Sequence, residues 1–374
     1  MSGNSHSSVN PAAVPGLSQR VWSLVFARTA PICERIAGLE SRLVSEQLPE
    51  KPLIEPVFIA GLARSGSTIL LEALSSLPTV TSWRYSDYPA VWFPYWWNWL
   101  RSRLPLPRKL PEERAHGDRI LVNPDSPEAF EEPFWMHFFP DRHQSDVDQV
   151  LDAATDNLRF EHFYPLQLRK LLAIRQASRY VCKGNYNLGR VGYIQRLFPD
   201  ARFVVPVRDP VAHVASLLKQ DRLFSAAAAE QPAVSRYLAR SGHFEFGPQR
   251  RAECLGDPAT GVAIQKDFDN GNLVSGFARQ WAHSYGWLAR QLAEQPGLGK
   301  VTLVVRYEDL CGEPAHELAR LGEHCGLEPA LTDQLVTDWA PRLSLPDYYR
   351  SGLNDADQAT IHRHCDEVAA GFGY

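Results

Sequence analysis

The chain has 374 residues, of which 44% are hydrophobic and 11% aromatic, so it is long enough and apolar enough to bury a substantial core. Its formal net charge is −4 at pH 7 and no basic stripe dominates. This argues against a nucleic acid partner, which would demand many phosphate contacts. Six scattered cysteines show neither C-x-x-C pairs nor zinc spacing, and we expect reduced thiols in a cytoplasmic protein.

The N-terminal stretch, residues 1–16, is rich in Ser, Asn, Pro and Ala and lacks a hydrophobic centre, so we expect a disordered tail rather than a signal peptide. Residues 17–44 are predicted to form two helical pieces separated at Pro31, with Thr29 as a candidate cap for the second. No apolar run is long enough to cross a membrane. We expect residues 17–374 to form a single domain.

Residues 56–74 read as a buried strand, a glycine-containing turn and an amphipathic helix. Such a turn aims several backbone N–H groups at one point and forms an anion cradle. The turn nearly matches the phosphate loop G-x-x-x-x-G-K-[ST], but Ser67 stands where that loop has lysine, and Thr68 follows. The cation lies inside the turn instead, as Arg64. This pattern favours a phosphate-like group over a triphosphate.

Further short apolar strands are predicted at about 79–83, 180–183, 202–207 and 301–305, with helical patterns between them. Strands in this arrangement form a parallel sheet covered on both faces, and ligands bind at the carboxyl ends of its strands. Arg64, Lys183, Arg208 and Tyr307 all follow or end such strands. They can therefore converge although they are far apart in the chain.

A second anion site is predicted where the strand at 202–207 runs into a helix. Arg208 sits at the strand end, Asp209 can cap the helix, and Pro210 suits its first turn. Ser216 follows Arg208 by eight residues.

These motifs resemble those of the sulfotransferases that use 3′-phosphoadenosine 5′-phosphosulfate as donor. The Arg-Ser-Gly-Ser-Thr run at 64–68 resembles their 5′-phosphosulfate loop, and Arg208 with Ser216 is similar to their 3′-phosphate element, although His213 stands where the family often has another arginine. The resemblance implies an α/β fold with a P-loop-like central parallel sheet, helices on both faces and a long aromatic-rich insertion. It implies donor binding, with no metal required, by Arg64, Ser65, Gly66, Ser67, Thr68, Arg208, Ser216 and Tyr307.

The resemblance also implies catalytic roles. Lys183 resembles the strand-end lysine beside the transferring sulfuryl group. An acidic residue soon after the second strand is the base in the tyrosine-protein and carbohydrate enzymes, and Asp87 is the only carboxylate at 82–89. Asp87 can equally cap a helix or bind Arg84. The other candidate bases lie in the insertion and are His116, Glu131 and Glu132.

Two insertions are expected, at about 88–178 and 220–273. The first is dense in aromatic residues, which suit a satellite core, an acceptor channel bounded by Trp92 to Trp99, or a contact with a membrane surface through the basic residues after that run. The second is predicted to be a mobile flap. The implied acceptor is a small or lipid-like molecule that presents a hydroxyl or an amine, and the oligomeric state stays open.

Two other functions fit the anion loop. One is a small-molecule kinase, which the missing lysine after Gly66 disfavours. The other is an inactive nucleotide-binding protein of the same fold.

Overall fold

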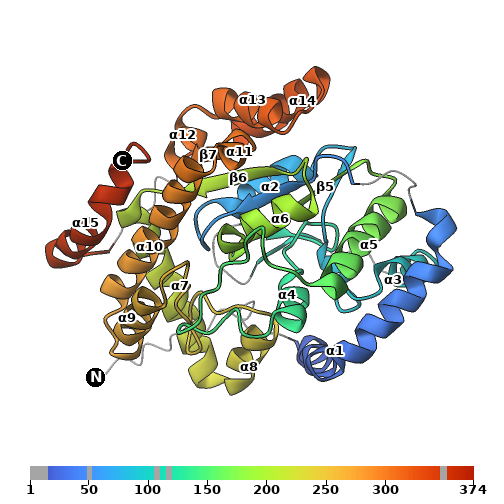
Figure 1. Ribbon diagram of the computed structural model, residues 1–374, viewed down its shortest axis with the longest axis horizontal. Helices are drawn as coiled ribbons and strands as arrows, with labels where there is room; N and C mark the ends of the chain where they lie inside the picture. Colours follow the sequence, from blue (N-terminus) through green and yellow to red (C-terminus); the bar gives the residue numbers. More distant parts are fainter. Residues whose placement is uncertain (1–15, 49–52, 105–109, 115–119, 346–351) are drawn as a thin grey trace, which may run out of the picture.

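Five parallel strands form the centre of the protein in a computed structural model, which describes residues 16–48, 53–104, 110–114, 120–345 and 352–374 (Figure 1). The strand order is β2-β5-β1-β6-β7, so β1 lies in the middle. The bounds are β1 Val57–Ala60, β2 Val80–Thr81, β5 Arg179–Gly184, β6 Arg202–Val207 and β7 Thr302–Arg306. The predicted parallel sheet is confirmed, with β2 shorter than expected.

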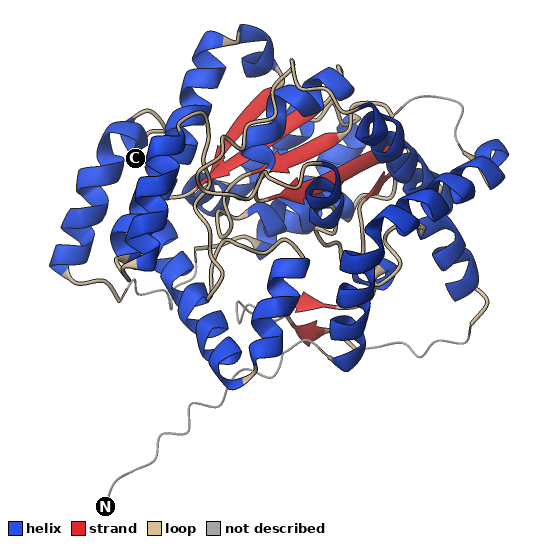
Figure 2. Ribbon diagram, turned by 60° about the horizontal axis from the view of Figure 1, so that its bottom comes forward, coloured by secondary structure: helices blue, strands red, loops and turns tan. Residues whose placement is uncertain are grey.

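Each face of the sheet packs against its own set of helices (Figures 1 and 2). Phe58 and Ala60 point into one hydrophobic cluster, while Val57 and Ile59 point into the other, because alternate residues of a strand face opposite sides. The smaller cluster is closed by α2, α13 and α14, and the larger by α5, α6, α7, α10 and α15. Burial on both faces explains why the strands read as continuous apolar runs.

The helices are α1 Leu17–Leu43, α2 Ser67–Ser75, α3 Pro94–Arg101, α4 Glu132–Phe138, α5 Leu158–Arg175, α6 Val191–Leu197, α7 Pro210–Glu230, α8 Pro232–Arg240, α9 Pro258–Asp269, α10 Leu273–Glu294, α11 Pro296–Lys300, α12 Tyr307–Gly312, α13 Pro314–His324, α14 Pro329–Trp339 and α15 Asp355–Ala370. A small antiparallel pair, β3 Glu112–Glu113 and β4 Leu121–Val122, lies outside the main sheet (Figure 2).

The N-terminal helix differs from the prediction, because α1 is one continuous helix through Pro31 rather than two pieces. Thr29 does not cap a second helix, since its hydroxyl donates to the Val25 carbonyl oxygen within α1. Burial of Cys33 and Ala37 against the core holds the second half in line with the first. Residues 1–15 of the expected tail lie outside the described residues.

The segment 220–273 is mainly helical, and its predicted mobility stays a prediction. The run of small residues at 225–229 extends α7, as the high helix propensity of alanine favours, and α8 and α9 follow. The connection after α8 is held by Asp221, whose carboxylate accepts hydrogen bonds from the Gly247 N–H and from Arg250.

The aromatic insertion forms α3, α4 and α5 and supplies much of the larger core cluster. Trp92, Phe134, Trp135 and Phe163 are all buried there, so these rings are core residues as expected, but they belong to the main core and not to a satellite core. All six cysteines are buried free thiols, as their scatter predicts. Among the helices of the described ranges, none has the length and hydropathy needed to span a bilayer.

Candidate active site

The turn between β1 and α2 has the geometry of an anion cradle. Arg64 adopts a left-handed backbone with φ of 73°, and Gly66 has φ of 107° immediately before α2 begins at Ser67. A Cβ atom on Gly66 would lie 2.7 Å from Cδ2 of Tyr307, so this position also needs glycine for space. The first N–H groups of α2 lie at this turn, where the positive end of the helix favours an anion.

Ser65 contributes less than expected. It is fully buried, and its backbone N–H donates to the Leu62 carbonyl oxygen at 3.2 Å, which closes the turn internally. Ser67 and Thr68, by contrast, line the cavity in front of the loop.

The second predicted anion site meets the first in space. Nε of Arg64 donates to Oγ of Ser216 at 3.3 Å, and Nη1 of Arg208 donates to the Arg64 carbonyl oxygen at 3.4 Å. The guanidinium carbon of Arg208 lies 4.9 Å from the ring centroid of Tyr307. Four predicted donor residues from three strand ends thus gather around one loop.

His213, the departure from the family pattern, supports this loop from behind. It is fully buried, and its Nε2 lies 2.8 Å from the Ala63 carbonyl oxygen. Burial lowers the pKa of its ring to about 3, with help from the charges of Arg208 and Arg64, so the ring is neutral at pH 7. His213 therefore holds the backbone and does not replace an arginine charge.

Lys183 stands at the carboxyl end of β5, where it pairs in register with Ile59 of the neighbouring β1. Its side chain lines the same cavity as Arg64, Ser67 and Thr68. Its Nζ lies 3.4 Å from Oε1 of Glu128. The sheet thus brings the predicted lysine to the mouth of the loop.

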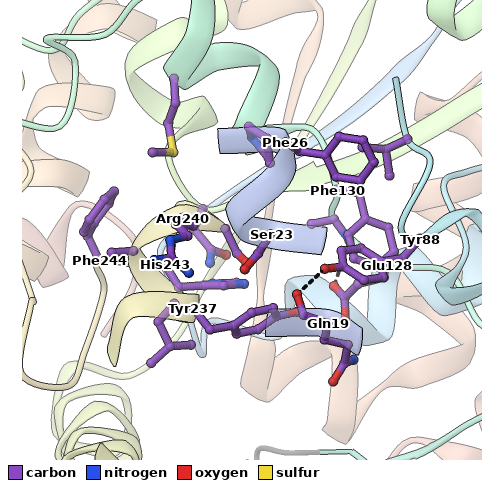
Figure 3. A pocket seen from close by; sticks show the side chains of 18 of the residues that line it. Gln19, Ser23, Phe26, Tyr88, Glu128, Phe130, Tyr237, Arg240, His243 and Phe244 are labelled. Carbon is purple, nitrogen blue, oxygen red and sulfur yellow. Dashed lines mark hydrogen bonds between the residues drawn. The ribbon is translucent and has the colours of Figure 1, made fainter. Parts of the chain in front are cut away.

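A cavity of about 1060 Å³ opens in front of these cations. Its walls come from α1, the segment 85–92, the segment 128–140, α8 and the segment 243–251. Figure 3 shows Phe26 of α1, Tyr88 and Phe130 on one side, with Tyr237, His243 and Phe244 on the other. The aromatic lining consists of Phe26, Tyr85, Tyr88, Trp92, Phe130, Phe224, Tyr237, Phe244 and Phe246. The cavity is therefore cationic at the loop and largely apolar beyond it.

Glu128 is the carboxylate that faces both the cavity and Lys183. It accepts hydrogen bonds from the Tyr85 hydroxyl at 2.6 Å and from the Ala129 N–H at 2.7 Å. Burial opposes ionisation, but Lys183, Arg114 and these two hydrogen bonds outweigh it and lower the pKa of Glu128 to about 2. The side chain is thus an ionised proton acceptor at neutral pH. Sequence reasoning missed Glu128, since only a proline-rich stretch surrounds it.

Arg114 is a further cation at the loop that the sequence did not indicate. It follows β3, is 7% exposed, and donates from Nη1 to Oγ1 of Thr68 at 3.2 Å. The β3–β4 pair thus carries a positive charge to the start of α2.

A histidine and a carboxylate form a second polar pair on the cavity wall. Nδ1 of His243 lies 3.4 Å from Oε2 of Glu245, and Glu245 also accepts a hydrogen bond from Asn185, two residues after Lys183. Burial disfavours the charged ring, but Glu245 and Glu128 outweigh burial and raise the pKa of His243. The cavity therefore has a titratable group opposite Glu128 (Figure 3).

The prediction that Asp87 faces the cavity is wrong. Its fully buried carboxylate accepts two hydrogen bonds from Nη2 of Arg175, each at 2.7 Å. It also accepts from the Arg84 N–H at 2.7 Å and from Asn98 at 3.0 Å. These partners occupy both oxygens, so Asp87 is a structural carboxylate that joins its own turn to α5.

The two glutamates among the alternative bases do not reach the cavity either. Glu132 accepts two hydrogen bonds from Arg190, at 2.6 and 2.9 Å, and one from His143 at 2.7 Å. Glu131 accepts a hydrogen bond from the Tyr164 hydroxyl at 2.8 Å, and burial raises its pKa. Neither lines the cavity.

His116, the third of the alternative bases, lies outside the described residues. Of the aromatic run expected to bound the acceptor channel, Trp92 lines the cavity, whereas Trp99 is 53% exposed and turned to solvent. Within the part of the chain that the structure describes, no group of three or more His, Cys, Asp or Glu side chains is placed to hold a metal ion.

Comparison with known proteins places these motifs in one family. The profile of the Sulfotransferase family matches residues 56–242, which is half of the chain and includes both anion sites. No curated protein sequence matches the chain.

Several solved structures are similar to it. Sulfotransferase STF9 from Mycobacterium avium shows 15% identity and a TM-score of 0.49, covering 88% of this chain and 81% of its own. STF1 from Mycobacterium tuberculosis H37Rv shows 16% identity and a TM-score of 0.47, covering 96% and 95%. A sulfotransferase from Alicyclobacillus acidocaldarius shows 15% identity and a TM-score of 0.31, covering 84% and 96%.

Proposed function

The chain belongs to the sulfotransferase family, and we propose that it transfers a sulfuryl group from 3′-phosphoadenosine 5′-phosphosulfate to a hydroxyl group of a largely apolar acceptor. The observation that carries this proposal is the 3.4 Å contact between Lys183 and Glu128, at the boundary between the anion loop and the aromatic cavity. A cation for the leaving phosphate and a carboxylate for the acceptor proton stand there side by side.

The donor fits the cations of the first half of the site. Arg64, the N–H groups at the start of α2 and Arg114 beside Thr68 would hold the 5′-phosphosulfate. Arg208 and Ser216 would hold the 3′-phosphate, and the Tyr307 ring lies over the loop near the nucleotide. The left-handed backbone at Arg64 and Gly66 supports this fit, since it turns the loop toward one point.

The chemistry divides between two side chains. The donor supplies an activated sulfur atom. Glu128 would take the proton of the acceptor hydroxyl as the new O–S bond forms, and Lys183 would donate a hydrogen bond to the phosphate oxygen as the old S–O bond breaks. A preorganised donor at such an oxygen is typically worth about 3 kcal/mol. The negative charge of the bound donor would partly neutralise Lys183 and so weaken the attraction between Lys183 and Glu128. The pKa of Glu128 would then rise, and Glu128 would become a stronger base.

The acceptor class follows from the cavity. At about 1060 Å³ it is at the upper end of ligand pockets, and its aromatic walls favour a substrate with a large apolar body. We infer an acceptor with a bulky aromatic or aliphatic body that places one hydroxyl between Glu128 and the loop.

The test has two parts. Adenosine 3′,5′-bisphosphate without metal should raise the melting temperature, and ATP with Mg²⁺ should not. Labelled donor should then transfer its label to phenols, sterols or long-chain alcohols in preference to sugars. Stabilisation by ATP with Mg²⁺ alone would point to a kinase. Binding of the bisphosphate without turnover on any acceptor would point to an inactive nucleotide-binding protein.

A further inference from the structure

The outer face of α1 carries a row of exposed apolar side chains along its whole length. Its members are Leu17 (76% exposed), Val21 (50%), Val25 (37%), Ile32 (56%), Ile36 (36%), Leu39 (48%) and Leu43 (65%). At helical spacing they fall within a stripe roughly 100° wide. The opposite side of α1, including Cys33 and Ala37, packs on the core. Because α1 is apolar on its outer side as well as on the side that packs on the core, we expect the outer side to contact a second partner.

Arginines line one edge of this stripe. Arg28, Arg35 and Arg42 are exposed and recur at seven-residue spacing. Both carboxylates of α1 are engaged elsewhere. Glu34 contacts Arg159 and His137, and Glu40 is fully buried against Lys170 at 2.7 Å. The outward face of α1 is therefore apolar and cationic, although the whole chain has a net negative charge.

A cationic groove adjoins the stripe. It has a volume of about 710 Å³, lies between α1 and α5, and is lined by five basic side chains, which are Arg35, Arg42, Arg159, His162 and Arg169. Among the described residues that line it, the only carboxylate is that of Glu34, which accepts a hydrogen bond from Arg159. At its rim Leu158 is 80% exposed. Basic side chains beside exposed apolar ones suit an anionic headgroup with its acyl chain.

We propose that the α1 face, meaning the stripe from Leu17 to Leu43 with its arginines and the adjoining groove, docks on an anionic lipid bilayer. The apolar side chains would enter the interfacial region and the arginines would bind headgroups. A second copy of the chain in an antiparallel twofold contact suits this face poorly, because the arginine edges of the two α1 helices would lie on the same side of the contact and repel each other.

Docking in this way would place the active site beside the bilayer. Gln19, Ser23 and Phe26 on the inner side of α1 line the acceptor cavity (Figure 3). Arg28, at the edge of the stripe, also lines it. A lipid-like acceptor would then reach the cavity along α1. This last step rests on the proposed function, whereas the docking itself does not.

The experiment is vesicle flotation of the full chain. The protein should float with phosphatidylcholine vesicles that contain phosphatidylglycerol and not with phosphatidylcholine alone, and added salt should weaken the binding because it screens surface charge. Substituting Arg35→Gln and Arg42→Gln together should weaken partitioning roughly 25-fold, as each basic residue near an anionic surface contributes about fivefold. Ile32→Gln with Leu39→Gln should also weaken it strongly.

The matched control is Val262→Gln, which removes an apolar side chain that is 49% exposed on α9, far along the chain from α1, and should leave partitioning unchanged. Stabilisation by adenosine 3′,5′-bisphosphate should persist in every variant, which separates loss of docking from loss of the fold or the donor site. The proposal would be overturned if the protein did not float, or if it floated equally well with uncharged vesicles. It would also be overturned if sedimentation equilibrium showed a dimer that the stripe substitutions dissociate.

Discussion

The donor side and the acceptor side of this site are built in different ways. The proposed donor side is built mainly on two strand-to-helix turns, each with its residues close together in the chain, as Arg64 with Thr68 and Arg208 with Ser216 are. Arg114 and Tyr307 join these turns from other segments. The acceptor side draws its wall from α1, the insertion, α8 and the segment after it. Local geometry therefore defines the first, and packing of distant segments defines the second.

The acceptor side is also backed by carboxylates that look alike in sequence and differ in their partners. Asp87 pairs with Arg175, Glu132 with Arg190 and Glu245 with His243. Glu128 contacts Lys183 and faces the cavity. The partner, rather than the residue type, decides which carboxylate is available for chemistry.

The largest effect is expected for Glu128→Gln. The amide keeps the size of the side chain but cannot take a proton, so kcat should fall by roughly 10² to 10⁴. Steady-state sulfuryl transfer measures this, and Asp125→Asn on the exposed turn nearby is the control. If Glu128→Gln turned over normally, the base would have to be another group, and His243 would be the first to examine.

Lys183→Met should lower kcat by roughly 10² to 10³, since the lysine acts on charge that develops in the transition state. The affinity for adenosine 3′,5′-bisphosphate should change little. Lys219→Met, an exposed position on α7, serves as the control. A large loss of nucleotide affinity with unchanged turnover at saturation would make Lys183 a donor-positioning residue instead.

Asp87→Asn should damage stability rather than chemistry. Removing one partner of a buried ion pair leaves the Arg175 charge uncompensated, which costs about 3–5 kcal/mol of unfolding free energy. Denaturant unfolding measures this loss, and kcat per folded molecule should be retained. The opposite pattern, normal stability with lost turnover, would return the role of base to Asp87.

Arg208→Ala should weaken binding of adenosine 3′,5′-bisphosphate by about 10- to 100-fold, because a hydrogen bond to a charged group contributes about 1.5–3 kcal/mol. Titration calorimetry or thermal stabilisation measures it. Arg202→Ala, at the other end of β6 and paired with Glu55, is the matched control. Unchanged affinity in Arg208→Ala would remove the 3′-phosphate from this position.

The last prediction concerns the pH dependence of stability through Glu253, a buried carboxyl. Burial and the neighbouring charges of Glu245 and Glu132 raise its pKa to about 8. Between the unfolded pKa near 4.5 and pH 8 the folded state holds the proton and the unfolded state does not, so stability falls as pH rises, by at most about 1.4 kcal/mol per pH unit.

Glu253→Gln abolishes this titration. The unfolding free energy of the variant, relative to that of the natural protein, should therefore increase as the pH rises from 5 to 8. Urea unfolding at several pH values measures the gain, with exposed Glu46→Gln as the control. A difference between the two proteins that does not vary with pH would show that Glu253 is ionised in the fold.

The sequence by itself determined the parallel sheet, the two anion turns and the strand-end position of Lys183. Each depends on residues close together in the chain, since a strand, its turn and the first helical residues set their own backbone geometry. Hence Arg64, Gly66, Arg208, Ser216 and Tyr307 were predicted from these local motifs and their resemblance to the sulfotransferase family, and the sheet brought them together.

Only the tertiary structure decided which carboxylate meets Lys183 and which face of α1 stays exposed. Asp87 and Arg175 are 88 residues apart, and no local pattern marks them as partners. Glu128 and Arg114 enter the site because the insertion folds back over the loop. The charge state of a side chain and its access to the cavity depend on its neighbours in space. These neighbours are set by packing between segments that are far apart in the sequence.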